Sequence, residues 1–238
     1  MPSVTAQCET LRIVGDHMLV ERDGKLCLLD TGVPDTMACP DIVSEMLGVP
    51  VHTLVGCREL ARSPLTIDWS GRSLRHAATP VHDSIPVRLG TAMFGVPTIR
   101  VATPTGEVEA VLDTGASLGY ASPEAVKGQQ AIRRVEDFLP GFGKFTVDVY
   151  RLDVAVGGVP LGLEVGILPS LLQMALGLMC RDGWILGAAL FRDRVVTLDL
   201  ASSMIHLAPT TTVARVVAER KTLSRARGST GDRKSCQY

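Results

Sequence analysis

Two copies of one tripeptide contain the residues of this sequence that are best suited to chemistry. Asp-Thr-Gly occurs at residues 30–32 and again at residues 113–115. At average residue frequencies, about 0.05 copies are expected by chance in a chain of this size. Each aspartate follows an apolar run, LCLL in the first copy and AVL in the second. Each carboxylate is therefore expected at the end of a buried strand, and the glycine two residues later allows a sharp turn and the close approach of a neighbour.

Two carboxyl groups held together can hydrolyse an amide without a metal ion or a covalent intermediate. Like charges about 3 Å apart cannot both form at low cost, so one pKa rises and the other falls. The ionised carboxylate can then act as a general base on a water molecule, while the protonated one donates to a carbonyl oxygen. Asp30 and Asp113 are the candidate catalytic pair, and neither a cofactor nor a metal ion is expected.

The residues before each tripeptide predict the same pair of strands. HMLVERDGKLCLLDTG precedes and includes the first copy, and RVATPTGEVEAVLDTG the second. Each segment consists of a strand, a turn with a glycine (Gly24 or Gly106) and an apolar strand that leads to the aspartate. The two halves of the chain are therefore expected to build their aspartate loops in the same way.

The residues after each tripeptide extend this internal repeat. Residues 54–77 align with residues 185–208 without a gap, at an offset of 131, which pairs glycine, threonine and aspartate residues with their own kind. Before these blocks, PDIVSEMLG and PSLLQMALG each predict a short amphipathic helix that begins at a proline. The two tripeptides are 83 positions apart, whereas the later blocks are 131 positions apart. Between its tripeptide and its later block, the second copy therefore has 48 residues that the first lacks. The sequence predicts a duplicated chain with unequal halves.

This repeat predicts three regions: a short first lobe at residues 1–82, a longer second lobe at 83–212 and a tail at 213–238. A linker with two prolines, ATPVHDSIP, joins the lobes. The tail contains seven Lys or Arg residues and two acidic ones, and it is expected to be a frayed helix followed by disorder.

The composition excludes several classes of protein. The formal net charge is -1, so neither a general nucleic-acid surface nor an anionic-membrane surface is expected. The most apolar window, residues 161–180, contains Pro169 and is expected to be part of the core rather than a membrane span. No secretory signal is recognisable, so the six cysteines are expected to be reduced and the location cytoplasmic. The histidine spacing does not suggest a zinc site.

The motifs resemble those of the retropepsin-like aspartic proteases. The resemblance is carried by AVLDTGAS at residues 110–117, WILG at 184–187 and VVTLDLASSMIHLA at 195–208, and more weakly by LCLLDTGV and LVGCREL in the first half. It implies an all-β acid-protease fold (retropepsin/pepsin-like) with a closed barrel. It also implies two unequal lobes related by a pseudo-two-fold axis, as in a fused, short form of the two-lobed pepsin plan.

The resemblance also implies roles for individual residues. Asp30 and Asp113 match the catalytic aspartates, and the threonine and glycine beside each match residues that brace the pair: Thr31, Gly32, Thr114 and Gly115. Two apolar-apolar-glycine strands are expected to pass beside the loops and to line substrate pockets: Leu54, Val55, Gly56, Ile185, Leu186 and Gly187. A flap over the substrate is expected within residues 133–154, with a tip at Gly141, Phe142 and Gly143.

Two features depart from the pattern of the family. The first lobe lacks the residues that would form its own flap, and Val33 follows the first tripeptide where Ala, Ser or Thr is usual. Because neither Val33 nor Ala116 offers a hydroxyl donor to an aspartate, a pH optimum near about 5 to 6 is expected.

The sequence therefore predicts an aspartic endopeptidase that acts on extended peptides or proteins as a monomer or homodimer. Two alternatives stay open. One is a homodimeric retropepsin that uses Asp113 from each chain, with the first lobe as an accessory domain. The other is a non-catalytic peptide-binding module on the same fold, which the short first lobe and Val33 would suit.

Overall fold

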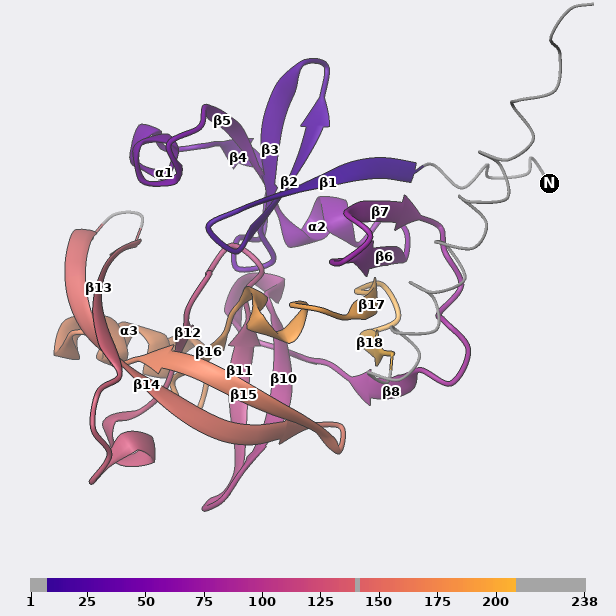
Figure 1. The fold of residues 1–238 in the computed structure, drawn as a ribbon. Coiled ribbons are helices and arrows are strands. Elements are labelled where there is room, and N and C mark those ends of the chain that lie inside the picture. Colours follow the sequence, from indigo (N-terminus) through magenta and orange to yellow (C-terminus); the bar gives the residue numbers. More distant parts are fainter. Residues whose placement is uncertain (1–7, 140–141, 209–238) are drawn as a thin grey trace, which may run out of the picture.

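The structure, a computed structural model, describes residues 8–139 and 142–208, and these residues form mainly β-strands in two bodies (Figure 1). The all-β expectation is therefore confirmed. Residues 1–7, the flap residue Gly141 and the tail expected at 213–238 lie outside the described residues.

The first body is built from short strands and two helices of one or two turns. Its elements are β1 (Cys8–Val14), β2 (His17–Arg22), β3 (Lys25–Leu29), β4 (Met37–Ala38), α1 (Asp41–Leu47), β5 (Val51–Val55), α2 (Cys57–Leu60), β6 (Leu65–Asp68) and β7 (Ser73–His76).

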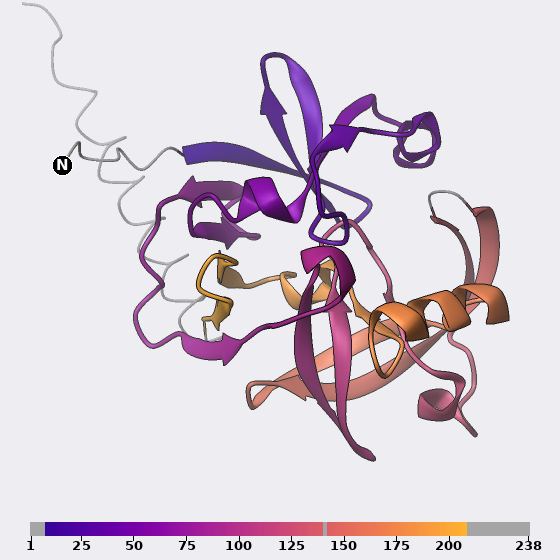
Figure 2. The same ribbon diagram turned by 180° about the vertical axis from the view of Figure 1, so that it is seen from behind.

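The second body contains longer strands and the longest helix of the described residues. Its elements are β8 (Ile85–Arg88), β9 (Gly90–Thr91), η1 (Met93–Gly95), β10 (Pro97–Thr103), β11 (Gly106–Leu112), β12 (Gly119–Tyr120), η2 (Pro123–Val126), β13 (Arg133–Leu139), β14 (Gly143–Val156), β15 (Val159–Gly166), α3 (Ser170–Met179), β16 (Trp184–Leu186), η3 (Ala188–Leu190), β17 (Val195–Asp199) and β18 (Met204–Leu207). Figure 2 shows the segment between β7 and β8 running along the outside of the two bodies.

The two sheets differ in closure. One has ten strands in the order β4-β5-β3-β2-β1-β7-β6-β17-β18-β8. The other has eight, in the order β13-β14-β15-β12-β16-β11-β10-β9, and an additional pairing of β14 with β10 closes six of them into a barrel. The closed barrel expected from the resemblance is therefore found in the second body.

The ten-stranded sheet crosses from one body to the other between β6 and β17. These strands are antiparallel, and their register places Leu65 opposite Leu198 and Ile67 opposite Val196. The hairpins β6–β7 and β17–β18 occupy the segments that align at an offset of 131 in the sequence. The repeat is thus expressed as two equivalent hairpins that meet edge to edge, which is the arrangement expected of a pseudo-two-fold axis.

Apolar side chains of both bodies form one large core. This cluster includes Leu29 and Val55 from the first body together with Leu112 and Leu186 from the second. A second cluster lies between the β13–β14 hairpin and α3. Because the strands that carry the tripeptides end in the shared core, packing fixes the position of both aspartate loops.

The two expected helices are present. Pro40 immediately precedes α1 and Pro169 immediately precedes α3. The apolar window at residues 161–180 divides into β15 and α3. No helix within the described parts of the chain is long and apolar enough to cross a membrane.

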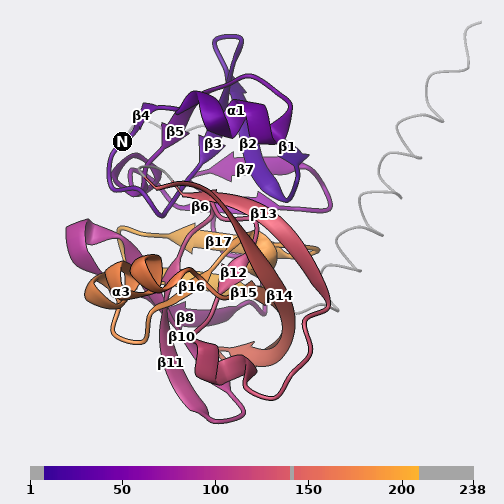
Figure 3. The same ribbon diagram turned by 90° about the vertical axis from the view of Figure 1, so that its left-hand side faces the viewer.

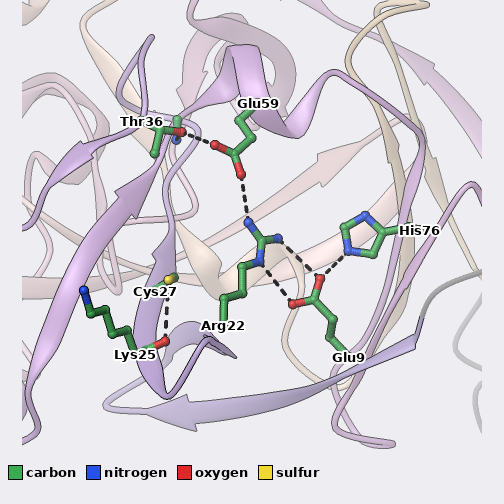
Figure 4. A network of polar contacts seen from close by, with 8 residues as sticks. Glu9, Arg22, Lys25, Cys27, Thr36, Glu59 and His76 are labelled. Atoms are coloured by element: carbon green, nitrogen blue, oxygen red, sulfur yellow. Dashed lines mark hydrogen bonds and ion pairs between the residues drawn. The ribbon is translucent and has the colours of Figure 1, made fainter.

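A network of polar side chains braces the first body (Figure 4). Arg22 on β2 forms ion pairs with Glu9 on β1 and Glu59 on α2, at 3.2 and 2.8 Å. Glu59 in turn accepts a hydrogen bond from Thr36 at 2.7 Å, and His76 on β7 contacts Glu9. Burial opposes ionisation of Glu9, but the hydrogen bonds from Arg22 and His76 outweigh this effect and lower its pKa. The network joins the loop after the first tripeptide to four separate elements, α2, β2, β1 and β7.

Candidate active site

The two aspartates begin equivalent loops at the ends of parallel strand pairs. β3 lies parallel to β5, and the backbone N–H of Asp30 donates to the carbonyl oxygen of Val55 at 3.0 Å. β11 lies parallel to β16, and Asp113 N–H donates to the carbonyl oxygen of Leu186 at 3.0 Å. Each aspartate loop therefore leaves its own sheet at the equivalent position of a parallel strand pair.

The threonines of the two tripeptides bind each other's loops. Thr31 Oγ1 donates to the carbonyl oxygen of Leu112 at 2.6 Å, and Thr114 Oγ1 donates to that of Leu29 at 2.8 Å. Each hydroxyl oxygen also accepts from the backbone N–H of the other threonine at 3.0 Å. Both threonines are fully buried, so these four bonds form in a medium of low dielectric constant and hold the loops rigidly against each other.

The same arrangement brings the two carboxyl groups together. A Cβ atom on Gly32 would lie 2.5 Å from Cγ of Asp113, and one on Gly115 would lie 2.5 Å from Cγ of Asp30. Each carboxyl group also accepts a hydrogen bond at 2.9 Å from the glycine N–H of its own tripeptide. Glycine is thus required at both positions because the opposite carboxyl group occupies the space of a side chain.

Burial and proximity shift the titration of both aspartates. Burial raises the pKa of Asp30 well above its ordinary value, and the charge of Asp113 raises it further. Burial also raises the pKa of Asp113, but hydrogen bonds from Gly115, Asp30 and Ala116 partly offset it. Both shifts oppose ionisation of the two carboxyl groups together and favour a proton shared by the pair, and the pKa is raised more strongly at Asp30.

The two strands beside the loops also approach them equivalently. A Cβ atom on Gly56 would lie 2.5 Å from the backbone of Asp35, and one on Gly187 would lie 2.4 Å from the carbonyl oxygen of Ala116. Cys57 N–H donates to the carbonyl oxygen of Val33 at 2.9 Å. The matching bond in the second lobe joins Ala188 to Ala116 at 2.8 Å. Val33 therefore leaves the backbone of the first loop in the same form as that of the second.

Both carboxyl groups line a cleft of about 430 Å³ between the two bodies. Leu54 and Ile185 line it as expected, but Val55 and Leu186 do not and are instead almost completely buried in the shared core. The expectation for these two residues is corrected because neighbouring residues of a strand point to opposite faces.

The expected flap is the hairpin of β13 and β14, which pairs Leu139 with Gly143 next to its tip. In Figure 1 it lies opposite α1, and in Figure 3 it lies at the boundary between the two bodies. Phe142, 42% exposed, does not line the cleft and packs edge-on against Phe145, which does. Gly143 has a φ of 96° and so supplies the left-handed conformation of the turn. No equivalent hairpin occurs between residues 32 and 51 of the first body, where β4 and α1 lie instead.

Several cleft residues were not foreseen from the sequence. The turn between β1 and β2 brings His17 to the cleft, and an ion pair of 2.5 Å joins Asp16 of this turn to Arg192 of the second body. From the other side, the Tyr120 hydroxyl donates to Asp137 of the flap. The repeat pairs none of these residues with an identical one in the other copy, so it gave no signal that they line the cleft.

The cysteine and histidine side chains form no cluster in the described part of the chain. Within residues 8–139 and 142–208, no three or more His, Cys, Asp or Glu side chains are grouped so as to hold a metal ion. The five cysteines in this part of the chain, Cys8, Cys27, Cys39, Cys57 and Cys180, are free thiols.

Comparison with solved structures identifies the fold. The chain is similar to the aspartic proteinase from Irpex lacteus, with a TM-score of 0.51 and 10% identity over 88% of this chain and 99% of that one. Weaker matches are basic 7S globulin from soybean, with a TM-score of 0.42 and 12% identity over 84% and 68% of the two chains, and the simian foamy virus (mac) protease, with a TM-score of 0.26 and 21% identity over 30% and 78%. Neither a family model nor a curated protein sequence matches significantly. At 10% identity, the similarity to the Irpex lacteus proteinase establishes an aspartic-proteinase fold and no more.

Proposed function

We propose that this chain is an aspartic endopeptidase that hydrolyses peptide bonds with a water molecule activated by Asp30 and Asp113. The observation that carries the proposal is the placement of each carboxyl group against the glycine of the opposite tripeptide, at one point of an open cleft. The threonine bonds that hold both loops support the same conclusion, because a catalytic pair must keep its geometry while a substrate enters.

The proposed reaction assigns opposite roles to the two carboxyl groups. Ionised Asp113 removes a proton from a water molecule, which attacks the carbonyl carbon of the scissile bond. Protonated Asp30 donates to the carbonyl oxygen and stabilises the tetrahedral intermediate. The carbon–nitrogen bond then breaks as the leaving nitrogen receives the proton held by Asp113, and Asp30 recovers its proton as the new carboxyl group forms.

The substrate class follows from the shape of the cleft. β13 is the edge strand of its sheet, so an extended peptide can lie beside the flap and form backbone hydrogen bonds. Leu54 and Ile185 offer apolar contacts on either side of the aspartates. We therefore propose extended peptide segments with apolar residues near the scissile bond as substrates, and a single chain as the active unit.

The two alternatives predict different results for the same experiment. A homodimer that uses Asp113 from each chain has no need of Asp30, although Asp30 already faces Asp113 within one chain. A non-catalytic module would bind peptides without turnover. No observation among the described residues specifically favours the homodimer or the binding module.

The test is cleavage of a peptide library by the purified chain between pH 3 and 8. Wild type, Asp30→Asn and Asp113→Asn would be compared at equal concentration, with products identified by mass spectrometry. Each substitution is expected to lower kcat at least about 10³-fold. Activity that survives Asp30→Asn and depends on protein concentration would support the homodimer, whereas peptide binding without cleavage by the wild type would support the binding module.

A further inference from the structure

The flap wall of the cleft contains a carboxylate without a cationic partner. Asp137 lies on β13 and lines the cleft. Its oxygens accept hydrogen bonds from the Tyr120 hydroxyl and, at 2.7 Å, from the backbone N–H of Phe138. Among the described residues, no lysine, arginine or histidine forms an ion pair with it. Its two donors are neutral, so its negative charge faces the cleft uncompensated.

The other acidic residues around the cleft are already paired. Asp16 is bound by Arg192, and Glu164 by Arg133 at 2.6 Å. Glu136, next to Asp137 on β13, is bound by Lys144 at 3.1 Å. Apart from the proposed catalytic pair, Asp137 is therefore the acidic group of the described cleft that remains available to a ligand.

Aromatic rings stand beside this carboxylate. Tyr120 and Phe145 both line the cleft, and their ring centroids are 6.4 Å apart with the planes tilted by 51°. The Tyr120 ring is buried and is held at its hydroxyl by Asp137, while Phe145 is partly buried. Phe145 is the cross-strand partner of Asp137 in the β13–β14 register, so a flat cation can lie against the Phe145 ring while its N–H groups reach the carboxylate.

We propose that Asp137 is a specificity residue that binds the guanidinium group of an arginine side chain in the substrate. The proposal rests on the endopeptidase function given above. Arginine fits better than lysine, because its planar fork can bond both oxygens of a carboxylate and stack on an aromatic ring. Tyr120 acts as a positioning residue, since its hydroxyl orients the carboxylate without touching the substrate.

The test uses otherwise identical peptides that contain Arg, Lys, Gln or Glu at each position around one cleaved bond. For one of these positions, the Arg peptide is expected to have a kcat/KM about 10- to 100-fold above the Gln peptide. Asp137→Asn should lower kcat/KM for the Arg peptide to about that of the Gln peptide measured with the same variant, while Asp137→Glu should retain part of the preference. Asp148→Asn is the matched control. Asp148 is a carboxylate of the same hairpin, but it pairs with Arg134 and lies outside the cleft.

Binding separates this inference from the proposed function. The inactive Asp113→Asn chain would be titrated with the labelled Arg and Gln peptides, with and without Asp137→Asn. A tighter Kd for the Arg peptide that depends on Asp137 supports the inference even where no peptide is cleaved. Equal affinity and equal kcat/KM for Arg and Gln peptides at every position would overturn it, whether or not cleavage occurs.

Discussion

The hydroxyl groups of Thr66 and Thr197 lie 2.8 Å apart, and the two residues are opposite each other in the register of β6 and β17. They are also separated by 131 positions, the offset of the internal repeat. A residue that is hydrogen-bonded to its own repeat equivalent lies on the axis that relates the two copies. The pair therefore marks the local two-fold axis, and the reciprocal bonds between Thr31 and Thr114 show the same symmetry at the aspartate loops.

This threonine pair predicts a strongly non-additive double-mutant cycle. Both hydroxyls are buried, so Thr66→Val or Thr197→Val alone leaves one buried hydroxyl without a partner and should cost about 1–3 kcal/mol. The double substitution removes both polar groups and should cost less than the sum of the single ones. Chemical unfolding of the four proteins would measure the cycle. Simple additivity would show that the two hydroxyls do not depend on each other.

Asp30→Asn is expected to stabilise the protein while it abolishes activity. Burial raises the pKa of Asp30 well above its ordinary value. Above about pH 4, the unfolded state therefore releases a proton that the folded state keeps, and this group destabilises the fold increasingly as the pH rises toward the folded-state pKa. An uncharged asparagine removes the effect, so the variant should gain about 1 kcal/mol over wild type near pH 7.5 and less near pH 4.

Thermal unfolding at both pH values would check this prediction, with Asp148→Asn as its control. A hydrogen bond from Arg134 lowers the pKa of Asp148, so its ionisation favours the folded state and its replacement should give no gain at higher pH. If the difference in Tm between Asp30→Asn and wild type became smaller as the pH rises, the assignment of the shared proton to Asp30 would be wrong.

Gly115→Ala should damage the site more than another glycine substitution in the same lobe. Its Cβ would lie 2.5 Å from Cγ of Asp30, and a carboxyl group displaced by about 1 Å should lower kcat about 100-fold. Gly177→Ala, in α3, meets no atom within 4 Å and should raise stability by up to about 1 kcal/mol with unchanged kcat. Steady-state kinetics with melting curves would separate the two effects, and equal kcat values for both variants would refute the close approach.

The sequence predicted those parts of the fold that the repeat duplicates. The strand pairs β2–β3 and β10–β11 and the helices after Pro40 and Pro169 are each encoded by local patterns of apolar residues, glycine and proline. The flap hairpin, which only the second body has, was instead implied by the resemblance to the retropepsin-like proteases. The closeness of Asp30 and Asp113 could be inferred because two equivalent loops in a duplicated chain must meet near its axis.

The sequence did not reveal which other side chains line the cleft around these loops. Asp137 reaches it from β13, which has no counterpart in the first lobe, and His17 reaches it from the start of β2, where the other copy has no histidine. The wrong assignment of Val55 and Leu186 has a related cause. A motif identifies which strand passes the loop, but the side of the strand that faces the cleft depends on twist and packing between the two bodies.

Thr114→Val should uncouple the two loops and so lower activity and stability together. Thr114 Oγ1 donates to the carbonyl oxygen of Leu29 and accepts from Thr31 N–H. Valine has nearly the same shape but leaves both backbone groups buried without partners, at a cost of about 2–4 kcal/mol. Thr114→Ser retains the hydroxyl and should restore most of the lost stability and kcat. Because a purely structural defect would leave the kcat of the folded fraction intact, kcat should be measured at least 15 °C below the Tm of each variant, where about all of the protein is folded. A normal kcat for the valine variant under these conditions would show that the cross-loop bond stabilises the fold without positioning the aspartates.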